Sequence, residues 1–114
     1  MSSPVTLLQN EELESIGFYE DKIQMFFYVC KVNVYAKLFL KKDALFIHPH
    51  HEGWRDALCE QINKKVTTTK IDVSDLIITF ENGVSFVISN QVKHQDKNRD
   101  YNPAVYIEIP DFKF

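Results

Sequence analysis

The feature that most constrains the fold is a pair of alternating apolar runs, residues 76–80 and 84–89, separated by the triplet Glu-Asn-Gly at 81–83. A three-residue loop at this triplet, with Gly83 in the left-handed conformation, places apolar residues opposite one another and makes one surface of a hairpin wholly apolar. A two-residue turn at Asn82 and Gly83 shifts the pairing by one position and mixes apolar and polar side chains on both surfaces. The sequence therefore predicts the three-residue loop, with these facing pairs: Leu76 and Ile88, Ile78 and Phe86, Phe80 and Val84.

The chain has 114 residues, enough for one hydrophobic core and too few for two ordinary domains, so we expect a single domain over residues 1–114. Hydrophobic residues make up 45% and charged residues 25% of the sequence, which is typical of a folded globular protein. Residues 1–20 lack a basic start followed by an apolar core, and no uncharged stretch reaches the roughly 20 residues that span a bilayer. We therefore expect a cytoplasmic protein in which Cys30 and Cys59 are free thiols.

Apolar alternation predicts further strands on either side of the hairpin. Residues 33–40 predict one continuous, half-buried strand, and Pro49 ends the strand that follows because proline lacks the amide that a sheet ladder needs. Residues 5–16 show no clear period, so a helical turn and an edge strand both remain open there, and residues 92–103 predict a loop. The expected strands are 23–29, 33–40, 44–48, 66–73, 76–80, 84–89 and 104–109.

One segment changes to helical spacing. Trp54, Leu58 and Ile62 fall on one stripe, which predicts a helix over about 53–63 with its apolar side against the sheet. The lysine pair at 64–65 is expected to complement the negative end of the helix dipole. The expected fold class is α+β: a mainly antiparallel β-sheet of six to seven strands with one helix packed on it.

Charge is unevenly distributed along the chain, although the net charge is only −3. Residues 1–30 carry a net −4, residues 31–70 a net +4 and residues 71–114 a net −3. A mildly acidic chain does not favour general nucleic-acid binding, which requires a positive face. If acidic residues of the two ends converge, they form a negative patch that steers a basic partner. The candidate partner-binding residues are Glu11, Glu12, Glu14, Glu20, Asp21, Asp72, Asp75 and Glu81.

Other residues could carry chemistry, and each has a simpler interpretation. His48, His50 and His51 are of a type that binds zinc, but Pro49 prevents a regular element from aligning them, so a solvated loop is favoured. Cys59 lies on the predicted helix, where no motif supplies an activating base. We therefore expect no catalytic residue, no metal site and no cofactor. Lysines near the aromatic residues of the strands leave a nucleic-acid platform as an alternative: Lys31, Lys37, Lys41, Lys42 and Lys70.

The hairpin DLIITFENGVSFVIS, the charged loop after it and the closing strand NPAVYIEI lie in the second half of the chain. Together, residues 65–109 resemble the closing part of small bacterial immunity proteins, including those paired with contact-dependent growth inhibition toxins. The resemblance implies a non-enzymatic protein that binds a cognate toxin domain, often a basic nuclease, and blocks its active site. It implies no particular functional residue, because such families share no fixed set.

The resemblance and the charge pattern together predict an inhibitor or immunity protein whose carboxylates occupy positions otherwise taken by the phosphates of the toxin's substrate. Tyr19, Tyr101 and Trp54 are candidate anchors, since aromatic side chains often dominate interface energy. Two alternatives stay open. One is a small nucleic-acid or ligand-binding β module that uses the basic middle segment, and the other is a metal-dependent enzyme built on the three histidines.

Overall fold

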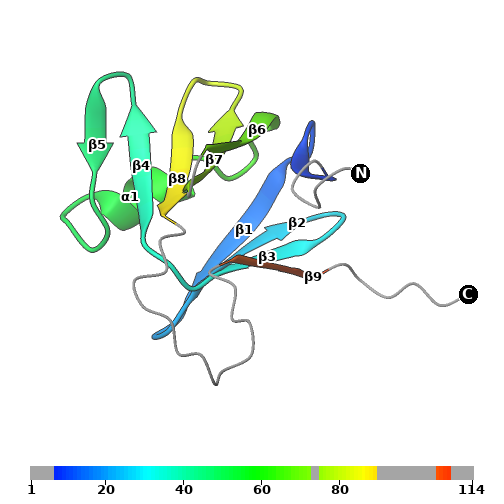
Figure 1. Ribbon diagram of the computed structural model, residues 1–114, viewed down its shortest axis with the longest axis horizontal. Helices are drawn as coiled ribbons and strands as arrows, with labels where there is room; N and C mark the ends of the chain where they lie inside the picture. The colour runs from blue at the N-terminus through cyan, green and yellow to red at the C-terminus, as the bar shows by residue number, and fades with distance from the viewer. Residues whose placement is uncertain (1–6, 73–74, 90–104, 109–114) are drawn as a thin grey trace, which may run out of the picture.

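The computed structural model describes residues 7–72, 75–89 and 105–108, which form two antiparallel sheets and one short helix (Figure 1). The elements are β1 (Leu13–Phe18), β2 (Ile23–Phe27), β3 (Lys31–Val34), β4 (Leu38–Lys42), β5 (Leu45–Ile47), α1 (Trp54–Cys59), β6 (Val66–Asp72), β7 (Asp75–Phe80), β8 (Ser85–Ser89) and β9 (Val105–Glu108). The first sheet has the order β1-β2-β3-β9, and the second has the order β5-β4-β8-β7-β6. A mainly antiparallel β fold with one helix is thereby confirmed. The described residues contain nine strands, not six or seven, and these are divided between two sheets.

The hairpin of β7 and β8 has the predicted register. Leu76 pairs with Ile88 and Ile78 with Phe86, and the members of both pairs are buried. The loop is closed by backbone hydrogen bonds from the Phe80 N–H to the Val84 carbonyl (2.8 Å) and from the Gly83 N–H to the Phe80 carbonyl (2.9 Å). Gly83 has a φ of 87°, which an L side chain rarely adopts, so glycine is favoured at this position.

Residues 33–40 do not form the single strand that was predicted. β3 ends at Val34, and β4 begins at Leu38 in the other sheet, so residues 35–37 carry the chain from one sheet to the other. The apolar alternation continues through the break, because every second residue is apolar and buried on both sides of it: Val32 and Val34 before, Leu38 and Leu40 after. Since both sheets bury the same set of positions, the apolar pattern contains no signal for the crossover.

The strand predicted over 23–29 is also too long, because β2 stops at Phe27. The chain reverses through Tyr28 and Val29 into β3, and the Phe27 N–H donates to the carbonyl of Cys30 (2.8 Å). Tyr28 is 78% exposed at this turn, so it is not on a buried strand face. β2 is nevertheless an inner strand of the first sheet.

The remaining predicted strands are confirmed with small changes at their ends. β5 ends at Ile47, two residues before Pro49, and pairs with β4. β6 is the edge strand before the hairpin, and β9 closes the first sheet against β3. The loop predicted over 92–103 lies outside the described residues.

The helix α1 is six residues long, shorter than the predicted span of 53–63. Trp54 and Leu58 are buried, as the helical spacing predicted. The chain then continues in turns as far as Asn63, which has a φ of 78° and donates its N–H to a carbonyl of β1 (2.7 Å). The lysine pair at 64–65 lies beyond the last helical turn, so its predicted role at the helix dipole is wrong.

No helix in the described part of the chain is long and apolar enough to cross a membrane.

The start of β1 links the two sheets. Residues 7–8 form a short 3-10 turn and β1 follows as an edge strand, so both forms left open for 5–16 occur in succession. Val66 of β6 accepts a hydrogen bond from the Asn10 N–H (2.7 Å) and donates its own N–H to the Glu11 carbonyl (2.9 Å). These two bonds tie the edge of the first sheet to the edge of the second.

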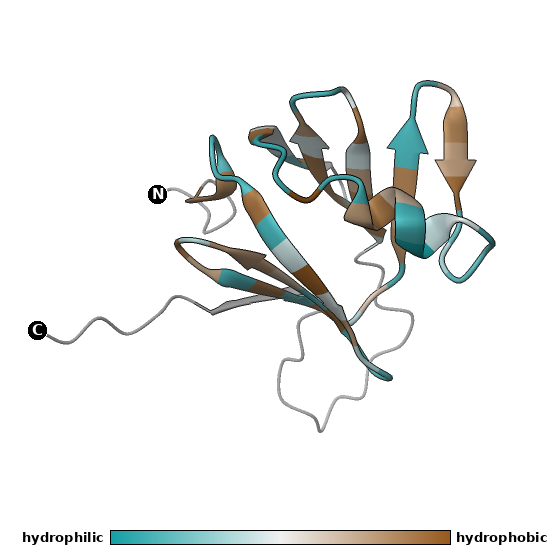
Figure 2. Cartoon of the chain, turned by 180° about the vertical axis from the view of Figure 1, so that it is seen from behind, coloured by the Kyte–Doolittle hydropathy of each residue, from teal (hydrophilic) through white to brown (hydrophobic). Residues whose placement is uncertain are grey.

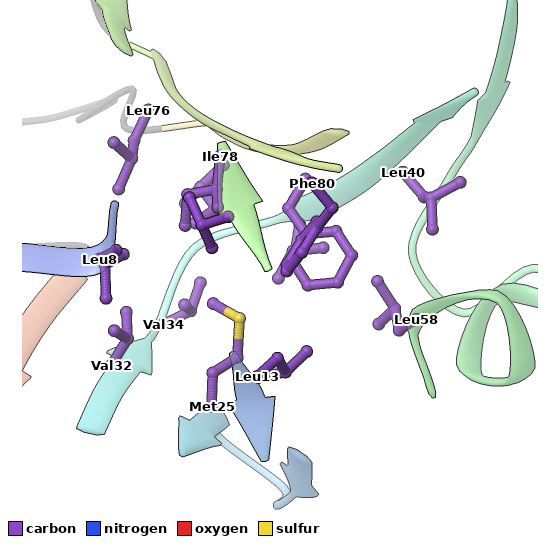
Figure 3. Packing of buried hydrophobic residues seen from close by; sticks show 14 of the residues in the cluster. Leu8, Leu13, Met25, Val32, Val34, Leu40, Leu58, Leu76, Ile78 and Phe80 are labelled. Carbon is purple, nitrogen blue, oxygen red and sulfur yellow. The ribbon is translucent and has the colours of Figure 1, made fainter. Parts of the chain in front are cut away.

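One cluster of buried apolar side chains draws on both sheets and on α1. Met25 and Val34 of the first sheet and Ile78 and Phe80 of the second are each exposed by 1% or less (Figure 3). The rings of Phe80 and Phe86 meet edge to face with centroids 4.8 Å apart. Along β1, the apolar residues Leu13, Ile16 and Phe18 are separated by polar or small ones (Figure 2). Burial of both inner faces in one core holds the sheets together.

Candidate functional site

A groove of about 720 Å³ opens where three connections between elements meet. Its walls are the β1–β2 turn and its flanks (19–23), the crossover from β3 to β4 (34–39) and the loop that leads from β5 towards α1 (48–51). Trp54 of α1 and Ser89 of β8 complete the lining. The site therefore depends on segments from both sheets and the helix, which tertiary folding brings to one place.

Trp54 forms a fixed part of this groove. It is 2% exposed, and its indole N–H donates to the carbonyl of Leu38 (2.9 Å), so its polar group is already satisfied within the protein. Its ring contacts Phe18 and His50, with centroids 5.9 Å and 5.0 Å away. Because Trp54 is buried, it is not available as a partner-binding anchor, and that prediction is wrong. Tyr101, another predicted anchor, lies outside the described residues.

The β1–β2 turn places two carboxylates at the groove. The Tyr19 N–H donates to the carbonyl of Lys22 (2.9 Å), which closes a tight turn with Glu20 and Asp21 as its two central residues. Both acids are exposed, and both line the groove. Neither carboxylate forms a hydrogen bond or ion pair with another residue in the described ranges, so both are available to a partner.

A row of three side chains, Tyr19, Lys22 and Tyr35, crosses the end of the first sheet beside this turn. The registers of β1 with β2 and of β2 with β3 bring the next residue of each strand side by side in this order. The Lys22 ammonium lies 5.6 Å from the Tyr19 ring centroid and 5.9 Å from that of Tyr35, within the range of cation–π attraction. The tyrosines are 53% and 49% exposed. We call this set the tyrosine–lysine row.

Gly17 provides space for one ring of the row. A Cβ atom at residue 17 would lie 2.9 Å from Cε2 of Tyr19, closer than real Cβ contacts come. The Tyr19 ring therefore lies over the bare backbone of Gly17, two residues earlier along the chain. The absence of a side chain at residue 17 allows this ring position.

The three histidines pack against aromatic rings. His48 contacts Phe39 and His51, with ring centroids 5.1 Å and 5.4 Å apart, while His50 contacts Trp54. In the part of the chain that the structure describes, no group of three histidine, cysteine or acidic side chains is placed to hold a metal ion. The imidazoles thus contribute ring surface and hydrogen-bonding nitrogens to the groove wall.

The other predicted acids lie elsewhere, and one group of them surrounds Lys65. Glu12 forms an isolated backbone bridge with Lys65, and the Glu81 carboxylate accepts the Lys65 N–H (3.1 Å). Glu11 precedes this bridge and Glu14 follows it on β1, where Glu14 is exposed. Glu81 is therefore already engaged in linking the hairpin loop to the start of β6.

The third location is the end of the β6–β7 hairpin, where Asp72 and Asp75 are register partners. β1 separates the acids near Lys65 from Glu20 and Asp21, and β7 separates Glu81 from Asp75. Each of these strands has six residues, which corresponds to roughly 20 Å at about 3.3 Å per residue. Of these acids, Glu20 and Asp21 line the groove, and Asp75 adjoins it as the register partner of Ser89, which is also a lining residue.

The two cysteines differ in environment. Both are free thiols; Cys30 is buried and Cys59 is exposed on α1. Burial, and secondarily the negative charge of Glu11, raises the pKa of the Cys30 thiol above its ordinary value of 9.0. Cys30 is therefore a neutral core residue at neutral pH.

Sequence reasoning did not single out three residues of the site: Gly17, Lys22 and Tyr35. Their proximity follows from the strand registers of the first sheet, which single-strand alternation does not predict.

The chain matches no protein-family model, no curated protein and no solved structure. The resemblance to immunity proteins consequently rests on the residues quoted for it, and the candidate site rests on the geometry of the groove.

Proposed function

We propose that this protein is a non-enzymatic immunity protein or inhibitor that binds a cognate toxin domain, a basic nuclease in the simplest case, and covers its active site. The observation that carries the proposal is the groove rim, where Glu20 and Asp21 stand beside the half-exposed rings of Tyr19 and Tyr35. Unpaired carboxylates and accessible aromatic rings together are what a protein-binding surface for a basic partner needs.

The two carboxylates account for recognition of a nuclease. A nuclease binds phosphates with lysine and arginine side chains, and Glu20 and Asp21 offer acceptor oxygens to the same side chains. Negative charge at an exposed turn also accelerates the encounter with a positive surface. Inhibition then requires only that the protein occupies the place of the substrate, without a chemical step.

The tyrosines account for the duration of binding. Each combines a large apolar ring with a polar hydroxyl and loses little conformational entropy when it is covered. Tyr19 and Tyr35 lie on adjoining parts of the groove wall and are about half exposed in the free protein. Their burial under a partner would slow dissociation, because residues of this type contribute most of the energy in many interfaces.

A second candidate function is a small-molecule binding module. The groove volume of about 720 Å³ is within the range of about 300–1,000 Å³ found for ligand sites. Its wall combines aromatic rings with charged side chains, which also suits a compact ligand. Saturable shifts of groove signals by a small metabolite, with no binding to any toxin domain, would favour this candidate over the immunity protein.

The test is co-expression with the product of each adjacent gene, with growth and complex formation by size-exclusion chromatography as readouts. We expect the wild type to restore growth, and the pair Glu20→Gln and Asp21→Asn to restore it less because both charges are removed without a change of shape. Glu60→Gln is the matched control, since Glu60 is exposed and does not line the groove. Absence of a complex with wild-type protein overturns the proposal.

A second comparison locates the interface. Charge reversal of the acids at residues 11–14 to lysine is expected to slow association through weaker long-range steering. Reversal of Glu20 and Asp21 is expected to slow association and also to accelerate dissociation, because those two groups contact the partner. Unchanged kinetics after the first reversal would remove residues 11–14 from the interface, and unchanged kinetics after the second would remove the groove.

A further inference from the structure

We propose that Tyr19 and Tyr35 form a receptor for one cationic side chain of the partner, an arginine in the best case, and that Lys22 occupies this receptor in the free protein. The inference deepens the proposed function by naming the chemistry that the groove recognises, and it rests on that function for the identity of the partner. The receptor itself can be tested without any toxin.

The backbone defines the receptor. Phe18 pairs with Ile23, and Ile23 pairs with Val34, so the next residue of each strand falls into one row at the sheet end. Side chains in such a row are separated by about 5 Å, so a central residue contacts both of its neighbours. Lys22 is the central residue, and the rings stand on either side of it.

The position of the Lys22 ammonium shows that the rings accept a cation. It lies within about 6 Å of both ring centroids, at 5.6 Å and 5.9 Å. Glu20 and Asp21 are adjacent in the same turn, yet Lys22 forms no ion pair with a residue of the described ranges. The two rings are thus the partners of this ammonium, while the two carboxylates keep their acceptor oxygens free.

An incoming arginine is better suited to this place than Lys22 is. A guanidinium is planar, stacks on aromatic faces and is less strongly hydrated than an ammonium. It can also form two parallel hydrogen bonds with one carboxylate, and Asp21 and Glu20 stand one and two residues before Lys22. The lysine stem is long and flexible, so the ammonium can move into solvent when an arginine enters.

Lys22 therefore acts as an internal competitor. The apparent affinity of a ligand that must displace Lys22 is the intrinsic affinity multiplied by the fraction of molecules in which the receptor is open. Removal of the competing charge is expected to tighten binding of an arginine side chain about threefold to sixfold, from the usual strength of an exposed cation–π contact.

The experiment is an NMR titration of the intact chain with the peptide acetyl-Gly-Arg-Gly-amide, followed through the ring signals of Tyr19 and Tyr35. Its citrulline analogue is the neutral control. The test variant is Lys22→Met, which keeps the stem and removes the charge. The matched variant is Lys37→Met, because Lys37 is an exposed lysine of the same groove that lies over neither ring.

We expect the arginine peptide to shift both rings and the citrulline peptide to shift neither. Lys22→Met should bind about three to six times more tightly than the wild type, with a clearly smaller change for Lys37→Met. Tyr35→Leu, which keeps an apolar side chain and removes the ring face, should weaken binding. Circular dichroism of each variant shows that it is folded.

The inference is overturned if the arginine peptide shifts neither ring, or if Lys22→Met binds no more tightly than Lys37→Met. Its failure is distinguishable from failure of the proposed function. A toxin complex that forms without any arginine-peptide binding refutes the receptor alone, whereas arginine-peptide binding without a toxin complex refutes the immunity function alone.

Discussion

Two glycines of this protein should respond to alanine in opposite ways. At Gly17 the added Cβ would lie 2.9 Å from Cε2 of Tyr19, while the backbone φ lies outside the left-handed region. At Gly83 an added Cβ meets nothing within 4 Å, but φ is +87°. Gly17→Ala should therefore disturb the tyrosine–lysine row with little effect on stability, and Gly83→Ala should destabilise the fold and leave the row intact.

The magnitudes follow from these two environments. The Tyr19 ring is half exposed and can swing away from a methyl group added at residue 17, so the free energy of unfolding should change by less than about 1 kcal/mol, including the gain from a less flexible unfolded chain. Loss of one ring from the row should weaken arginine-peptide binding roughly twofold to fivefold. Alanine at residue 83 must adopt the left-handed conformation, which costs about 1–2 kcal/mol.

Urea unfolding and the peptide titration measure both quantities on the same samples. Gly83→Asn provides a control, since asparagine tolerates the left-handed region better than alanine and should lose less stability. Equal stability losses for Gly17→Ala and Gly83→Ala would refute the separation of the two roles. Unchanged peptide binding in Gly17→Ala would show that the ring position over Gly17 does not matter for the receptor.

Three further outcomes are expected. A thiol reagent should label Cys59 quickly and Cys30 only on unfolding. Because burial raises the pKa of the Cys30 thiol, this thiol contributes fully to the free energy of unfolding below pH 9.0, and the contribution declines as pH rises through the folded-state pKa. Urea titrations between pH 8 and pH 10 measure this decline. Trp54→Phe removes the indole donor to a carbonyl of β4 and should lower the free energy of unfolding by about 1–3 kcal/mol in urea; a neutral result would mean that this bond contributes nothing. Reversal of Glu20 and Asp21 to lysine should reduce the association rate with the toxin domain most strongly at low salt, and salt-independent kinetics would contradict the steering argument.

The hairpin of β7 and β8 could be predicted in full because its information is local. The side-chain period of a strand is two, so a wrong register would place Phe86 opposite Thr79 and expose apolar groups. The position of Gly83 selects the loop, since glycine readily adopts a positive φ. The buried face of α1 was predictable for the same reason, from the spacing of Trp54 and Leu58.

The division into two sheets could not be predicted in this way. Val34 and Leu38 lie on opposite sides of the crossover, yet both are buried in one cluster. Alternation reports which face of a strand is buried and not which sheet the strand joins. The extent of α1 was also beyond local reasoning, because the helix ends ahead of the turn in which Asn63 bonds to β1.

For the candidate site, sequence and structure determined different things. The sequence by itself determined that acidic groups exist at residues 20–21 and that Tyr19 adjoins them. Tertiary structure decided that this acidic pair lines the groove, away from the acids near Lys65, and that Lys22 and Tyr35 complete the site. The physical reason is that composition and periodicity describe each segment alone, whereas a binding site depends on strand registers and on the burial of both sheets in a common core.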